Sequence, residues 1–388
     1  MNRLFHIIWR EWKRYLLLPY LRRMLLIIPV ILFFFYAWIY QEQEIRDLPV
    51  AIWDEDQSDI SRRIQFLLEQ TPSIHITTSV TDQAVLQNKI MSGEISGAIH
   101  FPRGMEAAVK SKHPVTVTVY TNAAALVPAK LLYKDAARVI ITAGSGVLLQ
   151  QYLRSGMATE KAMALVQPVK VTAYTLYNPT FNYRYYLVPG LVTVALQMLF
   201  IMVSALGINK EEEEGSFAEA WRIAGASPSL LLMGKLLAQV IFSWFHFILI
   251  AGILYPLHHL GQPGALVKFF LLHNLLVLAC TGLGLFLSVI FRDVMLALDA
   301  ALFYTSPAFV FSGFTFPRWA MPWYDQVYAK LLPYTHFLDA YIKTYTMNSP
   351  LRYGIMEMLM LLLFCFAPLS VAVLVLARRY RSPIAFAS

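Results

Sequence analysis

Long apolar runs alternate with polar stretches along the chain. A helix needs roughly 20 apolar residues to cross the hydrocarbon layer of a membrane. Six runs are of about this length, which is more than one soluble core requires. They are Met24–Tyr40, Leu187–Ile208, Leu230–Tyr255, Phe269–Phe291, Val294–Phe314 and Ile355–Ala377. The pattern therefore predicts an α-helical polytopic membrane protein with six transmembrane helices.

Residues 41–184 separate the first run from the second and show a different pattern. Strands are expected at Leu48–Trp53, Ser73–Thr78, Gly97–Phe101 and Val115–Tyr120. Helices are expected at Asp59–Gln70, Thr81–Ser92 with Thr81 as its cap, Pro102–Lys110 and Ala125–Ser155. Alternating strands and helices indicate a small α/β domain, which would lie outside the cytoplasm.

Composition supports the membrane assignment. Hydrophobic residues make up 57% of the 388 residues and charged residues 14%. Soluble domains usually hold about 45–50% apolar and about 25% charged residues, so a purely soluble protein is excluded. An aromatic content of 14% also excludes a disordered chain.

The net charge of +8 is concentrated at the two ends of the chain. Residues 1–23 hold six basic residues and one acidic residue, and residues 378–388, a predicted cytoplasmic tail, hold three arginines. Basic residues flank transmembrane helices on the cytoplasmic side, so both termini are predicted to be cytoplasmic. Because the basic clusters adjoin the apolar runs, we expect no nucleic-acid partner.

Residues 1–23 are also predicted to form an amphipathic helix. Leu4, Ile8, Trp12 and Tyr15 recur at helical spacing, and basic residues occupy other positions. Such a helix suits the membrane interface. The alternative is a simple cytoplasmic extension of the first transmembrane helix.

No catalytic or metal-binding pattern emerges from the sequence. Gly234–Lys235 lacks the spacing of a phosphate-binding loop, so any nucleotide would be bound by a partner. The acidic residues near position 55 lack the glycine and the final glutamate of a calcium loop, which favours a solvated turn. These residues are Asp54, Glu55, Asp56 and Asp59. His75, His100 and His113 show no metal-ligand spacing, and Cys280 and Cys365 fall in apolar runs, where packing is their expected role.

The loop 209–229 is the one predicted cytoplasmic loop with negative charge. It begins with Lys210 and four glutamates, and a short amphipathic helix is expected at Phe217–Ala224. Such an element suits the docking of a partner, although a plain solvated connection has the same composition.

Several short motifs occur in an order that resembles the permease subunits of the ABC-2 (ABC type-2) transporter family. The likeness covers essentially the whole chain and is nearest to bacterial inner-membrane permeases for drug or small-molecule efflux. The matching elements are Tyr177-Asn178-Pro179, Glu213-Glu214-Gly215-Ser216 with Glu219, Gly282–Arg292, Ser312-Gly313, Phe316-Pro317, Met321-Pro322-Trp323 and Leu332-Pro333. The chain departs from the family pattern at Ser216 and at Trp221.

The resemblance implies a partner that supplies the energy. It implies a cytoplasmic ATP-binding subunit that carries ATP and Mg, with no cofactor on this chain. Residues 1–23 would form the connecting helix and the loop 209–229 the coupling helix. The implied coupling residues are Glu213, Glu214, Gly215, Ser216, Glu219 and Trp221. A second permease copy or a paralogue, membrane lipid and a periplasmic adaptor protein are the other implied partners.

A transport path and an outer gate are expected within residues 185–377. Asp299, in the fifth run, is costly in a membrane and is therefore a functional candidate, with Arg292 and Lys235 as potential partners. Other path candidates, for which lipid contact or helix packing is the alternative, are Met198, Met202, Phe303, Phe309 and Phe311. Residues 314–352 would re-enter the outer leaflet as short helices. Their gate candidates are Phe316, Pro317, Met321, Pro322, Trp323 and Pro333.

The sequence therefore predicts an exporter permease for a hydrophobic or amphipathic small molecule in a bacterial inner membrane. The competing hypothesis is a membrane-anchored sensor or assembly protein whose outer domain binds a ligand. A secondary transporter is disfavoured because no inverted repeat is visible and few charges lie in the runs.

Overall fold

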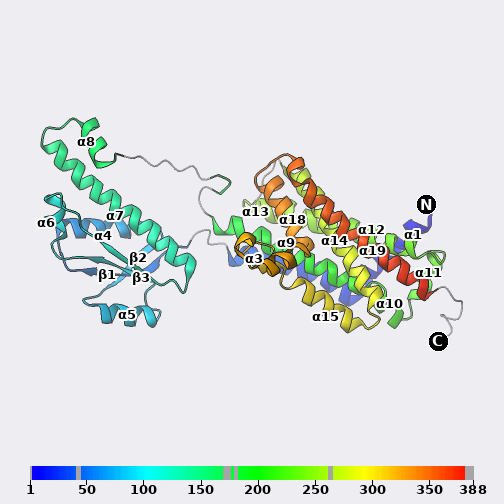
Figure 1. The fold of residues 1–388 in the computed structure, drawn as a ribbon. Helices are drawn as coiled ribbons and strands as arrows, with labels where there is room; N and C mark the ends of the chain where they lie inside the picture. The colour runs from blue at the N-terminus through cyan, green and yellow to red at the C-terminus, as the bar shows by residue number, and fades with distance from the viewer. Residues whose placement is uncertain (1, 41–44, 169–175, 179–181, 261–264, 381–388) are drawn as a thin grey trace. The chain divides into compact units, whose positions relative to one another are not determined.

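The computed structural model describes residues 2–40, 45–168, 176–178, 182–260 and 265–380. The chain forms two compact units (Figure 1). The helical unit contains residues Met1–Gln41 and Asn182–Ser388, and the α/β unit contains residues Glu42–Phe181.

The α/β unit is built on a four-stranded sheet with the strand order β2-β1-β3-β4. Strand β1 is parallel to β2 and to β3, whereas β4 is antiparallel to β3. The strands are β1 (Leu48–Asp54), β2 (Ile74–Ser79), β3 (Gly97–Phe101) and β4 (Thr118–Thr121). The helices are α4 (Asp59–Glu69), α5 (Gln83–Met91), α6 (Met105–Lys110), α7 (Leu126–Arg154) and α8 (Thr159–Val166).

Helices cover both faces of this sheet because successive strand residues point to opposite sides. Val50 and Ile52 pack with apolar residues of α4 and α7 on one face. Ala51 packs with Leu86 of α5 on the other face. Figure 1 shows the same arrangement, with α4 and α7 on one side of the strands and α5 on the other. A small α/β sheet is thus confirmed.

Three local predictions for this unit were wrong in detail. The strand expected at Val115–Tyr120 is the shorter β4, because β3 pairs with it only from Gly97 to His100. Asp82, not Thr81, caps α5 by accepting a hydrogen bond from the backbone of Val85. Helix α6 starts after Gly104, whose φ of +80° suits glycine, and not at Pro102.

The acidic residues near position 55 are used within the α/β unit. The Asp54 carboxylate accepts hydrogen bonds from Ser61 Oγ at 2.7 Å and from Gln65 Nε2 at 2.8 Å. Asp56 accepts one from the backbone of Glu106 at 3.0 Å. In the described part of the chain, no three metal-binding side chains gather into a candidate metal site.

Six helical segments of the helical unit are long and apolar enough to cross a membrane, which confirms the predicted number among the described residues. They are Pro19–Ile39, Arg184–Glu213, Pro228–Leu257, Leu266–Ile290, Val294–Phe311 and Leu351–Arg379. The helices of this unit, in order, are α1 (Asn2–Leu17), α2 (Pro19–Arg22), α3 (Ile28–Ile39), α9 (Tyr183–Ala205), α10 (Asn209–Glu213), α11 (Phe217–Ile223), α12 (Pro228–Phe247), α13 (Tyr255–Leu257), α14 (Leu266–Ile290), α15 (Val294–Thr305), α16 (Ala308–Phe311), α17 (Trp323–Lys330), α18 (Pro333–Tyr341) and α19 (Ile355–Arg379).

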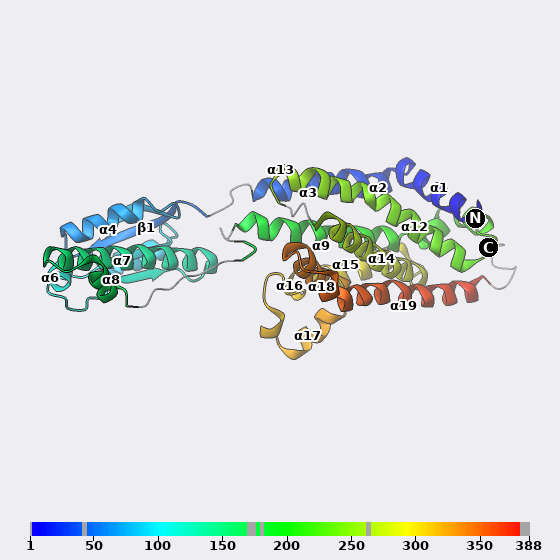
Figure 2. The ribbon, with the colours of Figure 1, turned by 90° about the horizontal axis from the view of Figure 1, so that it is seen from above.

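Two ends of the helical unit matter for function (Figures 1 and 2). Helices α1, α10 and α11 and the last turns of α19 lie at one end, here called the cluster end. Helix α13 and the first turns of α9 lie at the other, here called the pocket end.

Helix α14 forms the centre of the packing and contacts α9, α12, α18 and α19. Small residues permit the close contacts. A Cβ atom added to Gly282 would lie 2.5 Å from the carbonyl oxygen of Cys365, and one added to Gly284 would lie 2.4 Å from Ser204 Cβ. Close approach of this kind is typical of helix packing in membranes. Cys280 and Cys365 are both buried free thiols in this packed region.

The fifth apolar run does not form one helix to Phe314. Helix α15 ends at Thr305, and α16 follows after Pro307, which has no backbone N–H to continue the helix. Short helices then occupy much of residues 314–352, as the prolines predict. Pro333 opens α18, and a π-helical turn at Ile342–Thr346 follows it.

Candidate functional site

The cluster end contains five charged side chains that meet in the interior of the unit. We call them the ionic cluster, and they are Arg10, Glu11 and Arg14 of α1, Glu211 of α10 and Lys235 of α12. Glu11 and Lys235 are each 2% exposed and Glu211 is fully buried. Charged residues are rarely buried unless they are paired.

Each buried charge of the cluster has partners of opposite sign. Lys235 Nζ lies 2.8 Å from Glu11 Oε1 and also contacts Glu211. Arg10 lies 2.9 Å from Glu211 Oε2, and Arg14 also contacts Glu211. Burial alone would lower the pKa of Arg10, but the charges of Glu211 and Glu11 raise it above its ordinary value. Removal of one partner would leave a buried charge uncompensated, which is strongly destabilising.

Helix α1 brings its charges to this site by packing along α12. Ile7, Glu11 and Tyr15 are buried at a spacing of four residues and so share one face of α1. Ile7 fits against Gly234, and Trp12 Nε1 donates a hydrogen bond to the carbonyl of Ala238 at 2.9 Å. The predicted amphipathic helix is present, but its buried face carries Glu11 as well as apolar residues.

The acidic loop is fixed to three parts of the unit. Glu211 joins it to α1 and α12 through the ionic cluster. Glu212 lies 3.3 Å from Arg379 and accepts a hydrogen bond from the Tyr380 hydroxyl at 2.6 Å, at the end of α19. The loop is therefore part of the packed body.

Helix α11 has one buried face and one exposed face. Phe217 and Trp221 are buried, and both pack against the ring of Tyr380. Glu219 and Arg222 are exposed. The exposed face is the part of α11 that remains open to a partner.

The six predicted coupling residues are not equivalent. Glu213 is exposed and pairs with Lys210 at 3.0 Å, and Glu219, although 66% exposed, pairs with Arg10 at 3.3 Å. Glu214 lies 3.6 Å from Arg14, and the Ser216 carbonyl accepts a hydrogen bond from Arg10. Gly215 has a φ of +71°, which glycine adopts without strain. Trp221, being buried, is a packing residue.

Lys235 is not the partner of Asp299, so that pairing was wrong. Its ammonium is enclosed between α1 and α10, where Glu11 and Glu211 neutralise it. Asp299 is exposed on α15, and within the described chain it forms no ion pair. Sequence reasoning missed Glu11 and Glu211 as site residues. Two signals in the sequence could have found the cluster. Lys235 lies in an apolar run, and Glu11 is the one acidic residue among the basic residues 1–23.

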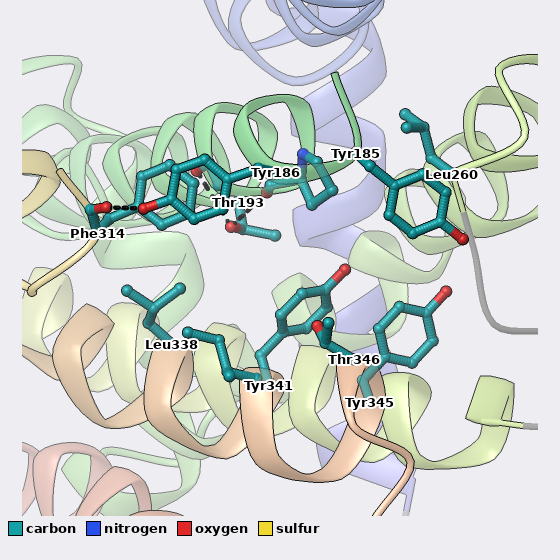
Figure 3. Close-up of a pocket in the computed structure, with 12 residues that line it drawn as sticks. Tyr185, Tyr186, Thr193, Leu260, Phe314, Leu338, Tyr341, Tyr345 and Thr346 are labelled. Carbon is teal, nitrogen blue, oxygen red and sulfur yellow. Dashed lines mark hydrogen bonds between the residues drawn. The ribbon is translucent and has the colours of Figure 1, made fainter. Parts of the chain in front are cut away.

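The pocket end contains a cavity of about 150 Å³, shown in Figure 3 and here called the tyrosine pocket. The residues that line it belong to α9, to residues following α13, and to the segment 314–352. They are Tyr185, Tyr186, Pro189, Gly190, Thr193, Leu260, Phe314, Leu338, Tyr341, Ile342, Tyr345 and Thr346. None of these side chains is charged.

Aromatic contacts and hydroxyl groups shape the pocket. The rings of Tyr186 and Phe314 stack with centroids 4.7 Å apart, and the Tyr186 hydroxyl donates to the Phe314 carbonyl (Figure 3). Gly190 is required beneath this pair, since an added Cβ would lie 2.1 Å from the Phe314 ring. The ring centroids of Tyr341 and Tyr345 lie 4.9 Å apart. A ligand here would meet aromatic faces and a few hydroxyl groups.

The predicted path and gate residues do not line the tyrosine pocket. Met198, Met202, Phe309 and Phe311 are half-buried, and Phe303 is 79% exposed. Phe316, Pro317, Pro322 and Trp323 are exposed, whereas Met321 and Pro333 are buried. The segment 314–352 nevertheless supplies half of the lining. Of the Tyr177-Asn178-Pro179 motif, Pro179 lies outside the described residues.

Comparison with known proteins identifies the family of the chain. Over 320 residues it is 23% identical to the probable multidrug ABC transporter permease YbhS of Escherichia coli (strain K12), covering 81% of this chain and 80% of YbhS. It is also 23% identical over 175 residues to the probable multidrug ABC transporter permease YbhR of the same organism. That match spans 45% of this chain and about half of YbhR, 47% of its length. Residues 22–374 match the family described as ABC-2 family transporter protein. With six candidate membrane spans and a match over most of its length, the chain is a membrane protein that belongs to the ABC-2 transporter family.

Proposed function

We propose that the chain is the permease subunit of an ATP-driven exporter in a bacterial inner membrane. The observation that carries this proposal is the ionic cluster. It ties the loop 209–229 to the N-terminal helix and to the third membrane-spanning segment through buried charges.

The partner is a cytoplasmic ATP-binding subunit, which binds ATP and Mg. It docks on the exposed face of the loop, which carries Glu213, Glu219 and Arg222. This docking places both termini in the cytoplasm, in agreement with the basic residues at both ends of the sequence.

The loop 209–229 and helices α1 and α12 move together as one unit. The ATP-binding subunit contacts α11 differently in each of its two states. This difference shifts the permease between conformations. Because Glu211, Glu11 and Lys235 are buried together, separating α10 from α1 or α12 would expose uncompensated charge. Helices α1 and α12 therefore move with the loop.

The cargo is a hydrophobic or amphipathic small molecule. The relatives YbhR and YbhS, which are named as probable multidrug ABC transporter permeases, support this class. The tyrosine pocket supports it as well, because aromatic side chains with a few polar groups are typical of small-molecule sites.

Other parts of the assembly follow from the same proposal. A second permease copy or a paralogue encloses the path with this chain. The α/β unit lies outside the cytoplasm, where it shapes the exit or contacts a periplasmic adaptor.

Charge reversal on the exposed face of the loop tests the proposal. Glu213→Arg and Glu219→Arg should reduce co-purification of the ATP-binding subunit and lower its stimulated ATP hydrolysis. Glu160→Arg, at an exposed position of α8, is the matched control and should change neither. Unchanged association in the two loop variants would contradict the docking assignment.

A further inference from the structure

Arg184 is a buried cation near the pocket end of the helical unit. Its side chain is 7% exposed, and its Nε atom has no hydrogen-bond partner. Within the described part of the chain it forms no ion pair. A buried N–H without a partner is costly, so an anion close to Arg184 would relieve that cost at Nε.

The position of Arg184 in its helix adds to this penalty. It is the second residue of α9, and the first turn of α9 contains no acidic side chain. The N-terminal end of a helix carries partial positive charge, which favours anions and disfavours cations. Asn182 satisfies one backbone N–H by accepting from Tyr185. Arg184 and the helix terminus together form a positive site.

Along α9, this positive site directly precedes two residues of the tyrosine pocket, although Arg184 itself is not among the lining residues. Tyr185 and Tyr186, the next two residues, both line the pocket. Figure 3 shows Tyr185 and Leu260 at one edge of it. Burial lowers the pKa of His258, which lies two residues before Leu260, and the charges of Arg184 and His259 lower it further. The charge of Arg184 therefore acts on His258, two residues before the lining residue Leu260.

We propose that the tyrosine pocket and Arg184 together bind an amphipathic organic anion. Its aromatic or apolar body lies among the tyrosine rings, and its carboxylate, sulfonate or phosphate group pairs with Arg184. A ring of tyrosines by itself also suits an organic cation through cation–π contacts, but Arg184 would repel it. The inference rests on the proposed function, since it names the cargo class of that permease.

A pair of matched fluorescent probes tests the inference without the ATP-binding subunit. The anionic probe is 1-anilinonaphthalene-8-sulfonate, and the neutral probe is N-phenyl-1-naphthylamine, which lacks the sulfonate. The full chain is placed in phosphatidylcholine nanodiscs, and the affinity for each probe is measured after subtraction of empty nanodiscs. The variants are Arg184→Gln, Arg184→Lys and, as control, Arg352→Gln, which removes an exposed charge.

The expected result is a selective loss. Arg184→Gln should lower the affinity for the anionic probe roughly tenfold or more, as expected for loss of a charge-assisted hydrogen bond. The affinity for the neutral probe should stay within about twofold, which also shows that the variant is folded. Arg184→Lys should retain most of the affinity, and Arg352→Gln should behave as wild type.

Two results would overturn the inference. Equal affinities of wild type and Arg184→Gln for the anionic probe would mean that Arg184 does not face the ligand. An equal loss of affinity for both probes in Arg184→Gln would mean that the substitution only damages the pocket.

Changing the lipid of the nanodiscs distinguishes a lipid headgroup from a soluble organic anion as the natural ligand. If phosphatidylglycerol in the nanodiscs displaces the anionic probe from wild type but not from Arg184→Gln, the natural ligand is a lipid headgroup. If it displaces nothing, the ligand is a soluble organic anion. Because these assays contain no ATP, a failure of ATP-driven transport would refute the proposed function and leave the binding result standing.

Discussion

The Nζ atom of Lys235 lies 2.8 Å from Oε1 of Glu11, although 224 residues separate the two in sequence. Both side chains are buried, and Glu211 shares the same lysine. A contact of this kind makes the N-terminal helix a structural part of the membrane-spanning unit.

Replacement of Lys235 by methionine tests the ionic cluster. Lys235→Met leaves Glu11 with less compensating charge and should destabilise the protein by about 3 kcal/mol, seen as a lower unfolding temperature. The double variant Glu11→Gln with Lys235→Met should lose less unfolding free energy than the two single variants lose together, because the contact is lost only once. Lys13→Met is the control at an exposed position of the same helix. Additive losses would show that the contact contributes nothing.

Replacement of Gly282 tests the packing of α14 against α19. Its added Cβ would lie 2.5 Å from the Cys365 carbonyl oxygen, so Gly282→Ala forces the two helices apart. We expect a loss of about 2 kcal/mol in unfolding free energy. In Gly252→Ala the nearest atom is at 3.6 Å, so thermal unfolding should be nearly unchanged. Similar unfolding temperatures for the two variants would contradict the close helix contact.

Replacement of Gly190 tests the tyrosine pocket. In Gly190→Ala the new methyl group would displace the Phe314 ring, which stacks on Tyr186. The affinity for N-phenyl-1-naphthylamine should fall by about tenfold, corresponding to about 1.4 kcal/mol. Gly252→Ala again serves as control. Full binding by Gly190→Ala would place the probe elsewhere.

Cysteine labelling tests the orientation. Phe66 in α4 is 64% exposed, and Ala218 in α11 is exposed. Each is replaced by cysteine in a chain without Cys280 and Cys365. A membrane-impermeant maleimide added to spheroplasts should label Phe66→Cys at once and Ala218→Cys only after lysis. The reverse pattern would place the α/β unit in the cytoplasm.

The sequence predicted elements better than contacts. Apolar runs report helix length directly, so the number of membrane-spanning segments was correct among the described residues. The residues of the α/β unit alternate strongly enough to predict its class. The end of α15 was misplaced because an apolar run does not reveal that Pro307 interrupts the helix.

Long-range pairing was beyond the sequence. Lys235 looked like a partner for Asp299 because both seemed to lie near one membrane surface. The pairing is decided instead by the face of α1 that meets α12, which puts Glu11 beside Lys235. The tyrosine pocket was missed for a similar reason. Its residues come from segments more than 50 residues apart in the chain, between Thr193 and Leu260 and again between Leu260 and Phe314.

Transport in a reconstituted system tests the central claim most directly. The permease and its ATP-binding subunit are placed in proteoliposomes, and movement of 1-anilinonaphthalene-8-sulfonate is followed with ATP and with a non-hydrolysable analogue. The account predicts movement that requires hydrolysis, is abolished by Glu213→Arg with Glu219→Arg, and persists in Glu160→Arg. Hydrolysis without movement of this probe or its neutral counterpart, or movement independent of the loop, would contradict it.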